Sequence, residues 1–327
     1  MSSRKLEVPE AVYNKVTTLG EVGQTWLDNL DELVRGLERD WRIKVGKALN
    51  GGSEAFVAEA VGEDNTEVVL KIAMPAMPGN TAFDNEVKAL TLVDGNGYVR
   101  LLRFDINRRA LLLERLGNSL GSLELPVNTQ IEIICRTLEK TWVHIPEQTQ
   151  CLTREGVFTL FRDLIGELCQ DINVSFSEKT INKALQFCES RALAFDHMTA
   201  VLVHGDAHSG NLLQVTPRND QTKYQFKLID PDGILCEPAY DLGVLMREWI
   251  DELLEDPIGL GRKRCEYISR LTDVSPRAIW EWGFIQCVAT GLLLAKVGQE
   301  QEGIKLLSVA DAWSKLDVLE LPLSYST

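Results

Sequence analysis

The sequence predicts an α+β protein with two lobes: an antiparallel β-sheet with one inner helix over residues 1–116, and a mainly helical lobe over residues 117–327. Short strand-like stretches separated by turn-forming residues fill the first third of the chain. After Gly117 the apolar residues recur mostly at helical spacing. The chain has 327 residues, of which 45% are hydrophobic, so it is long enough for two lobes with a large buried core.

The composition is acidic, which narrows the range of partners. The chain has 34 Lys and Arg against 48 Asp and Glu, a formal net charge of −14. Nucleic acids and anionic membranes select basic surfaces, so we expect neither as the main partner, whereas a cationic small molecule would be attracted. The charged start MSSRKLEVPE is unlike a signal peptide, and the apolar run CVATGLLLA is too short to span a bilayer. We therefore expect a cytoplasmic protein.

The cysteines indicate core residues. There are seven, an odd number, and none forms a CxxC pair. This pattern favours reduced cysteines that act as small apolar side chains over a zinc site or a disulfide framework.

The N-terminal lobe is predicted to begin with an amphipathic helix at about residues 24–39, where Trp26, Leu30 and Leu37 fall at helical spacing. Residues 42–73 contain the strand-like stretches AFVAEAV and EVVLKIA, with the turn formers NGGS and GEDN, as is typical of an antiparallel meander. The stretch TAFDNEVKALTL returns to helical spacing, and YVRLLRFD and ALLLERL add two strands. The predicted order is three strands, one helix and two strands.

The C-terminal lobe is predicted to consist mainly of helices. Apolar residues take helical spacing over about residues 127–143, 153–170, 178–197, 240–255 and 275–298. Only VLVHGD, NLLQV and YQFKLID interrupt this pattern with short strand-like pieces.

The most specific segment is HGDAHSGN, His204 to Asn211, a polar loop between the apolar stretches VLV and LLQV. It holds an acid, Asp206, and the amide of Asn211 five positions apart. This pattern suits phosphoryl transfer, because a carboxylate can orient an attacking hydroxyl and accept its proton, while an amide oxygen can reach a magnesium ion that bridges phosphates. A second candidate ligand is Asp230, which the strand end KLI places ahead of the turn PDG; Mg²⁺ prefers such oxygen ligands.

The loop resembles HGDxHxxN, the catalytic loop of aminoglycoside phosphotransferases and related small-molecule kinases, and Asp230 resembles the metal-binding Asp in the DFG position of protein kinases. WLDNLDELVRGLERDW, GYVRLLRFDINRRALLLERL and RAIWEWGFIQCVATGLLL are more diffusely similar to the streptomycin 6-kinase and hydroxyurea phosphotransferase branch. The resemblance implies a bilobal protein-kinase-like fold, Asp206 as the catalytic residue, Asn211 and Asp230 as metal ligands, ATP or GTP as the donor, and Mg²⁺.

Nucleotide contacts are predicted in the N-terminal lobe. Lys71 ends the strand VVLK, as the phosphate-binding Lys does on the third strand of kinases. Glu86 falls on the apolar face of its predicted helix, where a carboxylate needs a partner, and Lys71 is the nearest candidate. The resemblance also places a phosphate loop at Gly51, Gly52 and Ser53 and an adenine-binding hinge at Glu114 and Leu116. Aligned on Val57, the loop keeps only Gly52 of the three glycines in the protein-kinase pattern GxGxxGxV.

The segment EPAYDLG resembles the dPAYDLA segment of the same family, which implies that Asp241 holds the catalytic loop by hydrogen bonds. In that family, acids on C-terminal helices line the pocket for a cationic substrate. Glu248, Asp251 and Glu252 are therefore candidates to bind the acceptor, and a solvated helix face is the alternative.

The predicted function is ATP-dependent, Mg-assisted phosphoryl transfer to a hydroxyl of a small molecule, such as an aminoglycoside of the streptomycin type. A housekeeping metabolite kinase of the same fold is the main alternative. DPDG also resembles the DxDG nucleophile motif of haloacid-dehalogenase-like phosphatases, in which Asp230 would form a phosphoaspartate. That fold needs parallel βα units, however, and the sequence after Gly233 is predicted to be helical. A non-catalytic nucleotide-binding module would lack one of the motif residues, and none is missing.

Overall fold

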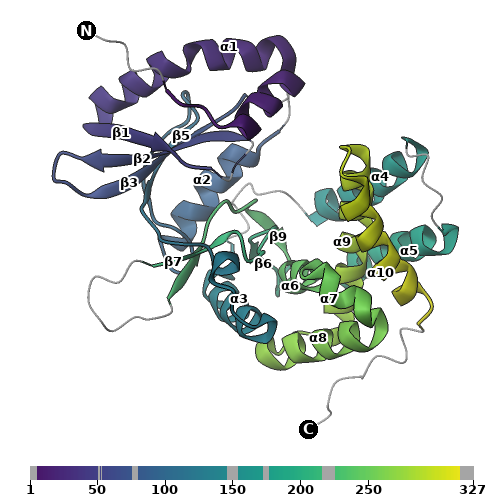
Figure 1. Cartoon of the computed structure of the whole chain (residues 1–327). Helices are drawn as coiled ribbons and strands as arrows, with labels where there is room; N and C mark the ends of the chain where they lie inside the picture. The colour runs from purple at the N-terminus through teal and green to yellow at the C-terminus, as the bar shows by residue number, and fades with distance from the viewer. Residues whose placement is uncertain are drawn as a thin grey trace. The chain divides into compact units, whose positions relative to one another are not determined.

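The chain folds into two units, seen here in a computed structural model (Figure 1). The structure describes residues 6–50, 52, 54–75, 80–145, 154–171, 177–215 and 225–316. The first unit comprises Met1–Gly117 with Gln214–Gln225, and the second comprises Asn118–Leu213 with Phe226–Thr327.

The first unit contains a five-stranded antiparallel sheet with the order β1-β2-β3-β5-β4. The strands are β1 (Ile43–Ala48), β2 (Ala55–Gly62), β3 (Glu67–Ala73), β4 (Leu101–Asp105) and β5 (Ala110–Glu114). Lys71 of β3 pairs with Val57 on one side and Leu111 on the other. Because side chains alternate along a strand, Lys71 lies on the opposite face from Leu70 and Ile72, which are fully buried. The predicted meander and the two later strands are confirmed.

Helix α1 (Glu10–Trp41) covers the face of the sheet that carries Leu70 and Ile72. The predicted helix at 24–39 lies within it, but the helix begins earlier, at Glu10. A kink at Gly20 (φ 62°, ψ −134°), a backbone conformation that favours glycine, separates the two parts. The first part has few apolar residues, but its Val12 and Val16 are buried in the core of the sheet. This sparse spacing explains why the sequence pattern gave only the second part.

Helix α2 (Ala82–Val93) lies on the other side of the sheet from α1 (Figure 1). Phe83, Val87 and Leu90 are buried, as their spacing predicts. The fourth position on this face is Glu86, whose carboxylate is therefore brought toward the same face of the sheet as Lys71.

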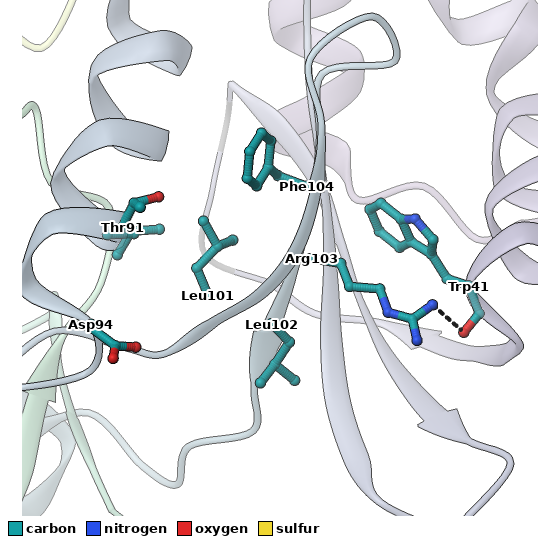
Figure 2. Close-up of a pocket in the computed structure, with 8 residues that line it drawn as sticks. Trp41, Thr91, Asp94, Leu101, Leu102, Arg103 and Phe104 are labelled. Carbon is teal, nitrogen blue, oxygen red and sulfur yellow. Dashed lines mark hydrogen bonds between the residues drawn. The ribbon is translucent and has the colours of Figure 1, made fainter.

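An open hollow of about 660 Å³ lies beside the edge strand β4 of this unit (Figure 2). At its wall, the Arg103 guanidinium donates to the carbonyl oxygen of Trp41 at 3.2 Å. None of the predicted site residues lines the hollow. Its lining is Trp41, Leu90, Thr91, Asp94, Leu101, Leu102, Arg103 and Phe104.

The second unit is mainly helical, with two small two-stranded sheets, β6 with β9 and β7 with β8. Its helices are α3 (Val127–Thr141), α4 (Arg154–Asp171), α5 (Glu178–Ala194), α6 (Ala239–Arg247), α7 (Ile250–Glu255), α8 (Pro257–Thr272), α9 (Pro276–Lys296) and α10 (Glu300–Ser314). A short 3₁₀ helix, η1 (Leu120–Leu123), precedes α3. The strands are β6 (Val201–Val203), β7 (Leu212–Gln214), β8 (Phe226–Leu228) and β9 (Ile234–Cys236).

Helix α9 is the core of the second unit. Trp280 and Trp282 are buried on it, and Trp282 packs against Tyr240 of α6 with ring centroids 4.8 Å apart. Glycine allows this close approach, because a Cβ on Gly243 would lie 2.8 Å from the Cβ of Trp282. α9 is long and apolar enough to cross a membrane by composition, but 78% of its most apolar window is buried inside the protein. That burial is typical of the central helix of a globular unit.

Several predicted boundaries in this unit were wrong. The single helix predicted at about 240–255 is two helices, α6 and α7, separated at Trp249, which has a left-handed backbone (φ 50°, ψ 49°). Helices α8 and α10 and strand β9 were not predicted. Three cationic residues in a row, Arg262 to Arg264, interrupt the apolar residues of α8, so its apolar spacing is sparse.

The cysteines that the structure describes carry free thiols, and all but Cys169 are buried. Burial raises the pKa of the Cys265 and Cys287 thiols to about 12, so these residues act as apolar side chains. Cys151 lies outside the described residues.

The packing of α1 on the sheet can be tested by truncation. Leu37→Ala removes a fully buried side chain, and we expect the free energy of unfolding to fall by about 2–5 kcal/mol. Val22→Ala, on the exposed side of the same helix, is the control and should change it by less than about 0.5 kcal/mol. Urea unfolding followed by circular dichroism measures both, and equal effects would show that α1 does not pack as described.

Candidate active site

A buried carboxylate holds the loop from His204 to Asn211. Asp241, at the start of α6, is fully buried, and its Oδ1 accepts the backbone N–H of Gly205 at 2.8 Å. Its Oδ2 accepts the N–H of His204 and the indole N–H of Trp142, both at 2.9 Å. Burial raises the pKa of Asp241, and these three donors oppose that shift because they stabilise the ionised form. The role inferred for Asp241 from the resemblance therefore has a direct geometric basis.

His204 is a structural part of this loop. It is fully buried, and burial lowers its pKa, so the imidazole is neutral. Its Nε2 lies 2.8 Å from the carbonyl oxygen of Ile229, and its Nδ1 accepts the N–H of Asp206 at 3.2 Å. These contacts assign the proton to Nε2 and connect this loop to the end of β8.

Gly205 is required by both conformation and space. Its φ is +99°, in the left-handed region, and a Cβ there would collide with the side chain of Asp232. The N–H of Asp232 donates to the carbonyl oxygen of His204 at 2.7 Å, so the two loops lie against each other.

Asp206, Asn211 and Asp230 belong to two adjoining loops. The Asn211 amide nitrogen donates to the carbonyl oxygen of Asp206 at 3.0 Å, which leaves its Oδ1 as an acceptor. The N–H of Ile229 donates to the carbonyl oxygen of Asn211 at 2.9 Å. Asp230 is the next residue in the chain, so this bond brings it close to Asn211. Asp230 is exposed and has a left-handed backbone (φ 57°).

These donors fit Mg²⁺ bound together with phosphates. In the part of the chain that the structure describes, no group of three or more His, Cys, Asp or Glu side chains could hold a metal by itself. Mg²⁺ usually takes one or two protein oxygens and completes its shell with water and substrate phosphates. The amide oxygen of Asn211 and the carboxylate of Asp230, on adjoining loops, are two such protein oxygens.

Sequence reasoning missed a residue in contact with Asp206. The Arg247 guanidinium, at the end of α6, lies 2.5 Å from Asp206 Oδ1. His208 Nε2 lies 3.5 Å from the other oxygen, Oδ2. Arg247 stands 41 positions from Asp206, and no local pattern in its own stretch indicates the contact.

The three predicted acceptor acids have different surroundings. Glu248 lies beside the catalytic loop, with Oε1 3.9 Å from Arg247. Burial raises its pKa, and the nearby charges of Arg247 and His208 oppose that shift. Asp251 pairs with Lys305 at 2.9 Å, and Glu252 pairs with Arg264 at 2.7 Å.

In the first unit, Lys71 Nζ lies 2.6 Å from Glu86 Oε1, so the predicted ion pair is present. The two side chains are only 12% and 9% exposed, and such a pair fixes the position of the lysine ammonium on its face of the sheet. Burial lowers the pKa of Arg109, and the negative charges of Asp84 and Glu86 oppose that shift. The Arg109 guanidinium lies over the ring of Phe83, 4.9 Å from its centre.

The other predicted nucleotide contacts are the phosphate loop at Gly51, Gly52 and Ser53 and the hinge at Glu114 and Leu116. Gly51 and Ser53 lie outside the described residues, and a Cβ on Gly52 would meet nothing within 4 Å. The carboxylate of Glu114 accepts the N–H of Arg100 at 2.7 Å, and Leu116 is buried.

The sequence profile of the aminoglycoside/hydroxyurea antibiotic resistance kinase family matches residues 43–298. The chain belongs to this family. It is 27% identical to a streptomycin 6-kinase of Streptomyces glaucescens over 86% of this chain and 90% of the relative. It is also 27% identical to a hydroxyurea phosphotransferase of Kitasatospora aureofaciens over 84% of this chain and 80% of the relative.

Solved structures of kinases share the fold. Choline kinase LicA from Streptococcus pneumoniae superposes with a TM-score of 0.58 at 17% identity, covering 86% of this chain and 99% of that one. A thermostable aminoglycoside phosphotransferase APH(4)-Ia, in a ternary complex with AMP-PNP and hygromycin B, superposes with a TM-score of 0.56 at 14% identity, covering 86% and 97%. The protein-kinase-like fold predicted from the motifs is confirmed.

As a member of this kinase family, the protein transfers a phosphoryl group to a small molecule. The phosphatase alternative is excluded, because Asp230 follows a strand of a two-stranded sheet in a protein-kinase-like fold, and not a central strand of parallel βα units.

The packing of the loop from His204 to Asn211 can be tested at Gly205. In Gly205→Ala, the left-handed backbone and the collision with Asp232 should displace the loop, and a misplacement of about 1 Å lowers turnover on the order of 100-fold. The control is Gly298→Ala, which has a similar φ of +84° but no neighbour within 4 Å of the added Cβ. It should lose about 1–2 kcal/mol of stability and keep its turnover. Equal turnover in the two variants would contradict the packing of Gly205 on Asp232.

Proposed function

We propose that the protein transfers the γ-phosphoryl group of ATP, or of GTP, to a hydroxyl of a cationic small molecule, with an aminoglycoside of the streptomycin type as the first candidate. The observation that carries this proposal is the loop of Asp206 and Asn211, held by Asp241 and joined to Asp230 through Ile229. Family membership and the names of the relatives support the acceptor class.

In this proposal Asp206 orients the acceptor hydroxyl and accepts its proton. The acceptor oxygen forms a bond to the γ-phosphorus, and the bond from that phosphorus to the bridging oxygen breaks, which releases nucleoside diphosphate and a phosphate monoester. The transition state is loose, so positioning and charge contribute more than basicity.

Asn211 Oδ1 and the Asp230 carboxylate would hold Mg²⁺, which when bound neutralises charge on the phosphates. Lys71, fixed by Glu86, would bind the nucleotide phosphates, and Gly51, Gly52 and Ser53 would line the phosphate loop. The backbone at Glu114 and Leu116 would meet the base. Residues 1–116 would thus form the nucleotide-binding lobe, and residues 117–327 would hold the catalytic loop, the metal ligands and the acceptor pocket.

We propose that the acceptor site includes Glu248, whose carboxylate lies 3.9 Å from Arg247, the residue that contacts Asp206. Asp251 and Glu252 would contribute a more distant negative field, because each already pairs with a cation of the chain. The net charge of −14 favours a cationic acceptor over nucleic-acid or membrane partners. We also propose that the enzyme is cytoplasmic, as its sequence predicts.

A kinase of a housekeeping metabolite would use the same loop, so the acceptor decides between the two candidates. Release of nucleoside diphosphate measured against aminoglycosides, amino sugars and neutral hydroxylated metabolites separates them. A preference for streptomycin-type acceptors supports the first candidate, and turnover restricted to a neutral metabolite would contradict it.

Asp206→Asn tests the catalytic role. Because the amide cannot accept the hydroxyl proton, we expect kcat to fall by about 10²–10⁴-fold, while nucleotide affinity, measured by calorimetry, stays within about twofold. Asp196→Asn, on a turn of the same unit, is the control and should retain full turnover. Undiminished kcat in Asp206→Asn would remove Asp206 from this role.

Lys71→Met tests the phosphate contact. Loss of one charge-assisted hydrogen bond, worth about 1.5–3 kcal/mol, should lower kcat/KM for the nucleotide by about 10- to 100-fold. Lys44→Met removes an exposed lysine of β1 and should leave kcat/KM unchanged. The same value for both variants would show that Lys71 does not act on the nucleotide.

A further inference from the structure

Arg247 makes the closest side-chain contact of the catalytic carboxylate. Its Nη2 lies 2.5 Å from Asp206 Oδ1, and its side chain is only 18% exposed, against 43% for Asp206. The rest of the guanidinium is also held: Nε donates to Gln286 Oε1 at 3.5 Å, and Nη1 lies 3.9 Å from Glu248 Oε1. A planar guanidinium fixed at several nitrogens has little freedom to move.

Gln286 is itself fixed on the core helix. Its amide nitrogen donates to the carbonyl oxygen of Tyr240 at 2.8 Å, and it is buried on α9. A Cβ on Gly283 would collide with Met246, so α6 and α9 lie close together just before Arg247. The support behind Arg247 is therefore a rigid part of the second unit.

The turn that follows α6 also helps to fix the position of Arg247. Helix α6 ends at Arg247, and Trp249 takes a left-handed backbone. The buried Arg264 of α8 donates to the carbonyl oxygen of Glu248 at 2.5 Å and lies 5.4 Å from the centre of the Trp249 ring. Its other terminal nitrogen binds Glu252. Arg264 thereby satisfies the end of α6 and stabilises a turn that an uninterrupted helix would not have.

The backbone contacts of the catalytic loop do not fix the carboxylate of Asp206. Asn211 binds its carbonyl oxygen and His204 binds its N–H, so the side chain could still rotate. Arg247 on Oδ1 removes that freedom. It leaves Oδ2, which lies 3.5 Å from His208 Nε2, as the oxygen that can receive a hydroxyl.

We propose that Arg247 is a positioning residue for phosphoryl transfer: it holds Oδ1 of Asp206 so that Oδ2 receives the acceptor hydroxyl. This inference rests on the proposed function of Asp206. Because the transition state is loose, orientation of the acceptor oxygen matters more than the basicity of a carboxylate paired with a cation. Arg247 acts through Asp206 and does not contact the transferred group.

The test is a double-mutant cycle on the full chain with Arg247→Met, Asp206→Asn and the double variant. We expect Arg247→Met to lower kcat on the order of 100-fold and to leave the KM for the nucleotide unchanged. Adding Arg247→Met to Asp206→Asn should change the residual turnover by less than twofold, because the carboxylate that Arg247 holds is already gone. Arg270→Met, an exposed arginine of α8, is the control and should keep wild-type turnover.

Rescue separates positioning from a loss of folding. Methylguanidinium added to Arg247→Ala should restore at least tenfold of the lost turnover, and it should restore none in Asp206→Asn. Thermal unfolding of each variant checks that the fold persists. A persistent loss of kcat when Arg247→Met is added to Asp206→Asn would overturn the inference and place Arg247 on the phosphoryl group.

Normal turnover in Arg247→Met, with Asp206→Asn still inactive, would also overturn the inference but leave the proposed function standing. Normal turnover in Asp206→Asn would instead remove the proposed function itself. The two failures are therefore distinguishable.

Discussion

The loop from His204 to Asn211 depends on one buried carboxylate. Asp241 stands at the start of α6 with no exposed surface, and its oxygens accept N–H groups from Trp142, His204 and Gly205. A buried charge is costly unless it is fully hydrogen-bonded, so the loop and the carboxylate stabilise each other only in this geometry. Removal of either partner would leave a buried polar group unsatisfied. This requirement fixes the backbone from which Asp206 and Asn211 project.

Asp241 also couples the loop to the rest of the second unit through α6. The same helix begins with the carboxylate that holds the loop backbone and ends with Arg247, which holds the side chain of Asp206. Because Gly243 and Gly283 allow α6 to pack closely against α9, both ends are placed by one rigid element. The two ends of this nine-residue helix thus hold the loop backbone and the side chain of Asp206.

Features that depend on residues close together in the sequence could be predicted, whereas features that depend on distant residues could not. Helical spacing along α2 placed Glu86 on an inward face, where a carboxylate needs a partner. Lys71 at the end of the stretch VVLK was the nearest candidate, so their ion pair could be predicted. The loop motif and the family resemblance gave the fold class. These inferences need only local periodicity and residue chemistry.

What could not be predicted depends on contacts between distant segments. The first part of α1 is helical because Val12 and Val16 reach the sheet, although its own apolar pattern is weak. The turn at Trp249 depends on Arg264 of another helix, and without it residues 240–255 look like one helix. The collision that makes Gly205 necessary involves Asp232, which is close only in the folded chain. Tertiary contacts overrode the local pattern in each case.

The acids of the second unit differ in how closely a cation of the chain accompanies each of them. Asp206, Asp251 and Glu252 each have a cationic side chain at 2.9 Å or less. Glu248 has the longest of these ion pairs, at 3.9 Å from Arg247. Burial raises its pKa, and the charges of Arg247 and His208 oppose that shift. If the proposed function holds, a cationic group of an acceptor beside Glu248 would further stabilise its ionised form, whereas a neutral acceptor would not.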